Sequence, residues 1–118
     1  MSRAIASYSP ILRAPAGTTL YVSGQIPLLP SGDLLSATLT DEVNLVLANL
    51  EAVLATESAT LADVVKTSVF LIDPANYLEM DTAYRARFGD PLPAREAVIV
   101  AGLPMGARVE ISAIAVVS

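Results

Sequence analysis

The sequence predicts a layered α+β domain in which two helices cover one face of a mixed β-sheet. Segments 40–57 and 74–88 space their apolar side chains by three and four residues, as amphipathic helices do. Four runs rich in β-branched and other apolar residues surround them, at 18–23, 64–72, 93–100 and 108–116. A chain of 118 residues suits one domain, so we expect residues 1–118 to form a single unit.

The N-terminal part of the chain supplies the first strand and a loop. Residues 2–16 contain two prolines and can add at most short edge strands. The run 18–23 is rich in β-branched and aromatic residues, which favours a strand. Gly24 follows directly, and two further prolines interrupt ladder pairing, so 25–36 is expected to form a loop.

The first helix is expected to begin at Thr40-Asp41-Glu42 and to end near Glu57. A threonine hydroxyl can cap the helix, and two acids in the first turn favour the helix dipole. Its apolar stripe comprises Val43, Val46, Leu47, Leu50 and Leu54. The run 64–72 that follows is apolar on both faces and predicts a buried strand.

The second helix is expected to start with Asp73 as N-cap and Pro74 in the first turn, and to close at Gly89. Asp81 falls on its apolar stripe, where a carboxylate needs hydrogen bonds or a pocket. The alternative is that Asp81 turns outward and pairs with Arg85. The stripe itself comprises Tyr77, Met80, Tyr84 and Phe88.

The last two runs, 93–100 and 108–116, are separated by a turn-like segment, so we expect them to form an antiparallel pair. Each carries a charge near its start, Arg95 in one and Glu110 in the other. The planar guanidinium of an arginine suits a small carboxylate, and a glutamate could hold a water or a protonated nitrogen. The alternative is that both are strand-end charges facing solvent.

Composition excludes several function classes. The chain contains no Cys and no His, which rules out thiolate nucleophiles, His-based dyads and Cys/His zinc sites within one chain. The net charge is −5, and the seven basic residues are scattered, so we expect no nucleic-acid partner. The apolar fraction is 53%, yet no run is long enough for a membrane helix. We therefore expect a cytoplasmic homo-oligomer with an apolar interface and no membrane contact.

An ordered set of motifs resembles one known family. They are Ser23–Pro27, Asp63–Leu71, Pro93–Arg95, Leu103-Pro104 and Val109–Val116. Together they resemble the reactive-intermediate imine/enamine deaminase family, also called the Rid, YjgF or L-PSP endoribonuclease family. The resemblance implies a chorismate-mutase-like fold and a homotrimer with a barrel-like core and clefts between subunits. It also implies cofactor-free, metal-free hydrolysis of 2-aminoacrylate and related 2-imino acids to 2-keto acids and ammonia.

The resemblance also implies roles for individual residues. Arg95 matches the arginine that binds the substrate carboxylate, Glu110 the glutamate that helps to place water, and Ser23 a pocket serine. The family's Gly-Pro-Tyr segment is absent, because Ser9-Pro10-Ile11 stands there, and Tyr8 is the candidate to replace its tyrosine. Asp81 stands where the family usually has a pocket asparagine. An added acid would repel a second carboxylate or favour a ligand that carries an amine.

Three functions follow from these observations. The favoured one is an imine deaminase that uses Arg95 and Glu110, since an imine already reacts readily with water and needs little acceleration. The second is a trimeric protein that binds a small carboxylate, or responds to one, without turnover. The third and least favoured is an endoribonuclease, because the chain lacks His and has a pI near 4.4.

Overall fold

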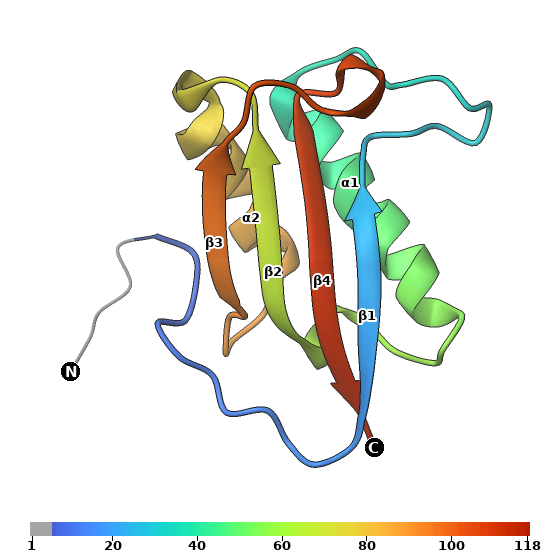
Figure 1. Cartoon of the computed structure of the whole chain (residues 1–118), viewed down its shortest axis with the longest axis vertical. Coiled ribbons are helices and arrows are strands. Elements are labelled where there is room, and N and C mark those ends of the chain that lie inside the picture. Colours follow the sequence, from blue (N-terminus) through green and yellow to red (C-terminus); the bar gives the residue numbers. More distant parts are fainter. Residues whose placement is uncertain (1–5) are drawn as a thin grey trace.

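The computed structural model describes residues 6–118, and within them four strands form one mixed sheet with two α-helices on the same face (Figure 1). The strands are β1 Thr18–Gln25, β2 Val64–Leu71, β3 Ala94–Ile99 and β4 Val109–Val117, and the helices are α1 Leu39–Ala55 and α2 Tyr77–Arg87. The predicted α+β architecture is therefore confirmed.

The strand order is β1-β4-β2-β3, with β4 antiparallel to both of its neighbours and β3 parallel to β2. The prediction of an antiparallel pair between the last two strands is wrong, because β2 lies between them. Helix α2 connects β2 to β3 as a crossover, which makes these two strands parallel and places β3 at the edge of the sheet. Segment 100–108 then carries the chain past the end of β2 to β4.

The described residues before β1, 6–17, form the N-terminal segment, which passes along the outer edge of β3 (Figure 1). The Ser9 backbone N–H donates to the Pro93 carbonyl at 3.0 Å, and Ser9 forms a single parallel bridge with Ala94. The Ser9 hydroxyl donates to the Leu92 carbonyl. An edge strand leaves backbone groups unpaired, so these bonds hold the segment beside β3. This short edge pairing agrees with the expectation for the part of 2–16 that the structure describes.

Helix α1 begins earlier than the sequence suggests. Its N-cap is Thr38, whose hydroxyl accepts a hydrogen bond from the Asp41 N–H at 3.1 Å. The prediction that Thr40 caps the helix is therefore wrong. The Thr40 hydroxyl and N–H instead donate to Oε2 of Glu79, at 2.8 and 2.9 Å, and so join the starts of α1 and α2. Asp41 remains in the first turn, where its charge favours the helix dipole.

The start of α2 also differs in detail. Asp73 caps a short 3₁₀ turn, Pro74–Asn76, and the α-helix itself begins at Tyr77. The predicted closure at Gly89 is wrong, because the cap residue is Phe88 and its backbone is extended. The chain leaves the helix directly toward β3, and no left-handed residue is needed at that point.

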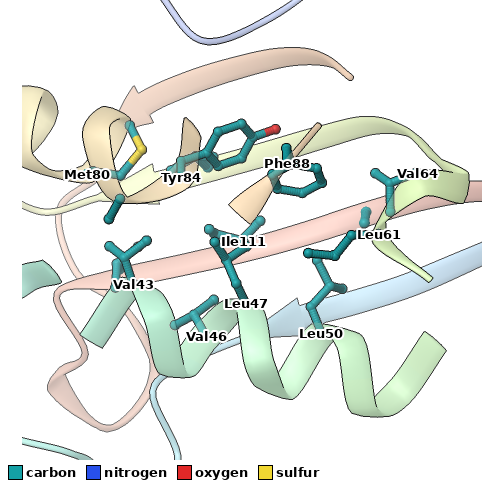
Figure 2. Close-up of a cluster of buried hydrophobic side chains, with 14 of the residues drawn as sticks. Val43, Val46, Leu47, Leu50, Leu61, Val64, Met80, Tyr84, Phe88 and Ile111 are labelled. Carbon is teal, nitrogen blue, oxygen red and sulfur yellow. The ribbon is translucent and has the colours of Figure 1, made fainter. Parts of the chain in front are cut away.

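The core lies between the helices and the sheet. Figure 2 shows side chains of α1 facing those of α2, with Ile111 of β4 between them. The fully buried side chains include Val43, Val46, Leu47, Leu50, Val69, Leu71, Met80, Tyr84, Val109 and Ile111. Each such apolar side chain stabilises the fold by roughly 1.5–3 kcal/mol through burial alone. Both predicted helical stripes therefore face this core.

The other face of the sheet has no helix over it (Figure 1). Tyr21 of β1 is 79% exposed and Val98 of β3 is 42% exposed. Glu110, Ser112 and Ile114 of β4 also lie on this open face, half-buried, while their neighbours in β4 point into the core. The predicted alternation along the last strand is thus confirmed. Among residues 6–118, no helix has the length and apolar character that crossing a membrane requires.

We expect the free energy of unfolding to become less sensitive to alkaline pH in the variant Tyr84→Phe. Burial raises the pKa of Tyr84 to about 12, against about 10 for an unfolded tyrosine. The folded state therefore holds the phenol proton more tightly. The stability that this group contributes is complete below pH 10 and is lost as the pH rises toward 12, by up to about 3 kcal/mol.

Urea unfolding at pH 8, 10 and 11 measures this effect. At pH 8, Tyr84→Phe should lower the free energy of unfolding by about 1 kcal/mol. The variant loses the hydrogen bond, 2.7 Å long, between the Tyr84 hydroxyl and Thr67 Oγ1. Between pH 10 and 11 the variant should lose less stability than the wild type. Tyr21→Phe is the matched control, since Tyr21 is exposed and its loss should leave the pH dependence unchanged. Equal alkaline losses in Tyr84→Phe and the wild type would contradict the prediction.

Candidate functional site

Arg95 is the second residue of β3, and its side chain points to the helix side of the sheet. In the register of the parallel pair it lies opposite Thr67, which is buried there. The Arg95 side chain is only 1% exposed. The alternative of a strand-end charge facing solvent is therefore wrong for Arg95. Its guanidinium is enclosed within the single chain, not at the mouth of an open cleft.

The guanidinium of Arg95 has two polar partners on α2. Nη1 lies 2.9 Å from Oδ1 of Asp81, and Nη2 donates to the Tyr77 hydroxyl at 2.9 Å. The approach to Asp81 is an ion pair by distance but lacks the geometry of a hydrogen bond. Nη1 is consequently a buried donor with no hydrogen-bond acceptor among the described residues. Such a donor is costly to bury unless something else binds it.

Three tyrosine rings surround the same guanidinium. Its Cζ atom lies 4.8 Å from the ring centroid of Tyr84, 5.6 Å from that of Tyr8 and 5.8 Å from that of Tyr77. Rings at these distances attract a cation through their faces. The sequence pattern placed Tyr77 and Tyr84 on the apolar stripe but gave no role to them at the site. Tyr77 precedes Asp81 by four residues and Tyr84 follows it by three, so helical periodicity indicates that all three side chains lie on one face of the helix.

Asp81 is held in place by the N-terminal segment. The Ser7 N–H donates to Oδ1 at 3.1 Å, and the Ser7 hydroxyl donates to Oδ2 at 2.9 Å. Asp81 thus has the hydrogen bonds that a carboxylate on the apolar stripe needs, and the alternative pairing with Arg85 is wrong. Nη2 of Arg85 instead lies 3.8 Å from Oδ1 of Asp90, at the surface. Tyr8 lies over the guanidinium, and no sequence pattern pointed to Ser7.

Glu110 is the second residue of β4 and lies on the open face, opposite Phe70 of β2. Its carboxylate packs over Gly24 so closely that a Cβ atom at Gly24 would overlap it. The pairing of β1 with β4 shifts register between Val22 and Gln25, which forms an irregularity at this point. Ser23 lies within this irregularity and is exposed. Ser23 is the chain neighbour of Gly24, on which Glu110 packs, and we call Glu110 and Ser23 the Glu110 group.

One chain does not bring the two groups together. Arg95, Asp81 and Tyr8 lie on the helix side of the sheet, whereas Glu110 points to the open side. A small ligand on Arg95 cannot touch the Glu110 of the same chain through the sheet. Among residues 6–118, no cluster of three or more Asp, Glu, His or Cys side chains is placed to bind a metal ion.

A hollow of about 360 Å³ lies between the end of β1, the following loop and α1, and Gly24 is among the residues that line it. Its polar side chains include Asn49, which donates to the carbonyls of Ile26 and Leu28 at 3.1 and 3.0 Å. The residues that line it carry no charge. The hollow therefore offers no cation for a carboxylate, and Arg95 remains the better candidate for that role.

The chain is similar in sequence to several known proteins. Residues 1–117 match the family described as Endoribonuclease L-PSP. The chain is 42% identical to the mouse 2-iminobutanoate/2-iminopropanoate deaminase over 99 residues, which cover 83% of this chain and 73% of the mouse protein. It is 38% identical over 112 residues to a RutC family protein of Pyrococcus horikoshii, covering 94% of this chain and 87% of that protein.

The fold agrees as well. The crystal structure of RidA from an Antarctic Psychrobacter superposes with a TM-score of 0.82 at 33% identity, covering 98% of this chain and 92% of that one. Sequence and structure thus match over nearly the whole chain, and some relatives are imine deaminases by name. The chain belongs to the Endoribonuclease L-PSP family, which is the Rid (YjgF) family that its motifs resemble.

Proposed function

We propose that this protein hydrolyses reactive 2-imino acids to 2-keto acids and ammonia. 2-Aminoacrylate, an enamine, becomes such a 2-imino acid when its terminal carbon takes up a proton from water. The observation that carries the proposal is the enclosed guanidinium of Arg95, whose Nη1 has no hydrogen-bond acceptor among the described residues. A guanidinium whose Nη1 is in an ion pair but has no hydrogen-bond acceptor among the described residues is suited to bind the carboxylate of a small acid. Membership of a family that includes named imine deaminases supports the reaction class.

The reaction needs water, one carboxylate and no redox change. Water adds to the carbon of the protonated imine while Glu110 accepts a proton from it, and the same proton then passes to the nitrogen. Collapse of the resulting carbinolamine breaks the C–N bond and releases ammonium and the 2-keto acid. A positioned general acid–base group of this kind contributes about 10²–10⁴-fold to the rate. In this scheme Ser23 holds the iminium nitrogen beside Glu110.

A homotrimer would bring the two groups together. Arg95 of one subunit and Glu110 of the next could line one cleft, because a single chain holds them on opposite faces of its sheet. The open face, with Tyr21 and Val98 exposed, supplies apolar surface for such an assembly. We propose that these open faces meet in a barrel-like core and that the clefts lie between subunits.

Access to Arg95 involves the N-terminal segment. Tyr8 lies against the guanidinium, and the segment is attached through Ser7 and Ser9 to α2 and to the edge of β3. These are few bonds for a segment that covers a charged group. We propose that Tyr8 shifts when the ligand carboxylate reaches Nη1, and that its ring then packs on the bound acid.

Coupling the protein to an amino-acid oxidase, which generates 2-imino acids in place, tests the proposal. The wild type should accelerate ammonia release and imine loss. Arg95→Lys keeps the charge but loses the planar pair of donors, so we expect about a 10- to 100-fold lower kcat/KM. Asp33→Asn, in the exposed loop after β1, is the control and should behave as the wild type.

The same assay separates the alternatives. Binding of a 2-keto acid without faster imine loss would instead indicate a ligand-binding or regulatory protein, the second interpretation of the sequence. An undiminished rate in Arg95→Lys and in Arg95→Ala would remove the role of Arg95. RNA cleavage that persists through repurification and disappears in Glu110→Ala would revive the ribonuclease interpretation.

A further inference from the structure

We propose that Asp81 makes the Arg95 site selective for ligands that carry a protonated nitrogen beside their carboxylate. The inference rests on the proposed function and narrows it. The zwitterionic 2-iminium acid should bind more tightly than the 2-keto acid that the reaction releases, because only the former offers a positive charge to Asp81.

The charge balance of the site favours a zwitterion over a simple anion. Nη1 of Arg95 and Oδ1 of Asp81 lie 2.9 Å apart, and their side chains are 1% and 18% exposed. The pair is therefore neutral as a unit and poorly solvated. A simple anion that binds Arg95 adds an uncompensated negative charge beside Asp81, which disfavours binding. A zwitterion leaves the net charge of the site unchanged.

The hydrogen-bonding capacity of Asp81 and Arg95 also favours a ligand with both a carboxylate and a protonated nitrogen. The two oxygens of Asp81 accept one hydrogen bond each from Ser7, whereas an ionised carboxylate offers about four acceptor positions. Asp81 can therefore accept further N–H groups. Nη1 of Arg95, close beside it, is a buried donor that lacks a hydrogen-bond acceptor among the described residues. Nη1 and the remaining acceptor positions of Asp81 lie side by side, which matches a carboxylate and a nitrogen on neighbouring carbon atoms.

The tyrosine rings around Arg95 and Asp81 also favour a ligand that carries a positive charge. The faces of Tyr8, Tyr77 and Tyr84 lie toward the guanidinium and favour positive charge in the space between them. The simpler role for Asp81 is that of a counter-ion that merely holds Arg95 in place. That role predicts weaker binding of every ligand when Asp81 is changed. Selectivity predicts opposite effects on two ligands.

Titration calorimetry with pyruvate and L-alanine distinguishes these roles. The two ligands have similar size and share the carboxylate, but alanine carries an ammonium group where pyruvate has a keto oxygen. We expect the wild type to bind alanine at least about tenfold more tightly than pyruvate. In Asp81→Asn, pyruvate should bind about 10- to 100-fold more tightly than it binds the wild type, and alanine more weakly.

The variant Asp81→Asn can retain both hydrogen bonds to Ser7, since an amide has an acceptor oxygen and the serine hydroxyl can accept from its nitrogen. Asp33→Asn removes one negative charge from an exposed loop and should leave the affinity ratio as in the wild type. Circular dichroism and the sedimentation profile establish that each variant is folded and assembled like the wild type.

The outcomes separate this inference from the proposed activity. A pyruvate-to-alanine affinity ratio that does not change in Asp81→Asn overturns the inference, as does weaker binding of both ligands. Equal binding of both ligands by the wild type overturns it without any variant. If the ratio changes as expected but no ammonia is released, Asp81 is a selectivity residue of a binding protein and the proposed reaction fails. If ammonia is released but the ratio is unchanged, only the inference fails.

Discussion

Mixed assemblies of two inactive variants, Arg95→Ala and Glu110→Gln, are expected to regain about a quarter of the wild-type rate of ammonia release. Each variant alone should lose about 10²–10⁴-fold in kcat/KM, because one removes the carboxylate anchor and the other the proton acceptor. The recovery follows from the structure. Arg95 and Glu110 point to opposite faces of one sheet, so the proposed site takes one of these groups from each of two chains.

The expected quarter of the wild-type rate equals the fraction of clefts that contain both Arg95 and Glu110. In a closed ring with random mixing, about half of the subunits keep Arg95 and the other half keep Glu110. A cleft works when its first subunit supplies the arginine and its neighbour supplies the glutamate, which happens in about one cleft in four. The experiment needs exchange of subunits, by refolding the two variants together. If the variants carry different tags and the assemblies are purified on both, trimers of a single variant are removed and the expected fraction rises to about one cleft in three.

Two controls make the result decisive. The variants kept in separate tubes and combined without exchange should show only their summed residual activity. Ultracentrifugation should show the same particle size for the mixture and the wild type. A co-refolded mixture that is no more active than that sum would mean that the two groups do not share a cleft. A monomeric wild type with full activity would contradict the proposed assembly as well.

Local patterns predicted most of the fold. Leu47 and Leu50 recur with the helical period and face the core, and the alternation of Val109 and Ile111 with Glu110 fixes the two faces of β4. Pairing between distant strands was harder. The turn residues in 100–108 suit a tight hairpin and a longer connection equally, and nothing local shows that β2 comes between β3 and β4.

The candidate site was predictable where a charge interrupts an apolar pattern. Arg95 and Asp81 stand out in this way, and the structure joins them in an ion pair. The separation of Arg95 from Glu110 was not predictable, because each face of β3 carries one charge, Arg95 on one and Glu96 on the other, and the sequence does not show which face is covered. Ser7 gave no signal, since its hydrogen bonds to Asp81 depend on where the N-terminal segment lies in the fold.

Gly24→Ala is expected to lower kcat/KM nearly as much as Glu110→Gln, by about 10²–10³-fold, while the free energy of unfolding changes little. A methyl group at this position would overlap the carboxylate of Glu110. That carboxylate is the end of a flexible, half-buried side chain, so it can rotate away toward the open face. The fold tolerates this movement, but a proton acceptor that moves by a few ångströms no longer reaches the attacking water.

A double-mutant cycle shows whether the glycine acts through the glutamate. If it does, adding Gly24→Ala to Glu110→Gln should cause no further loss of activity, because the group that the methyl displaces has already lost its function. Gly102→Ala is the matched control, since nothing lies within 4 Å of the position its Cβ would take, and its activity should equal that of the wild type. Losses that add in the double variant would assign Gly24 to another task, such as the pairing of β1 with β4. Full activity in Gly24→Ala would show that the reaction does not depend on where this structure places the Glu110 carboxylate.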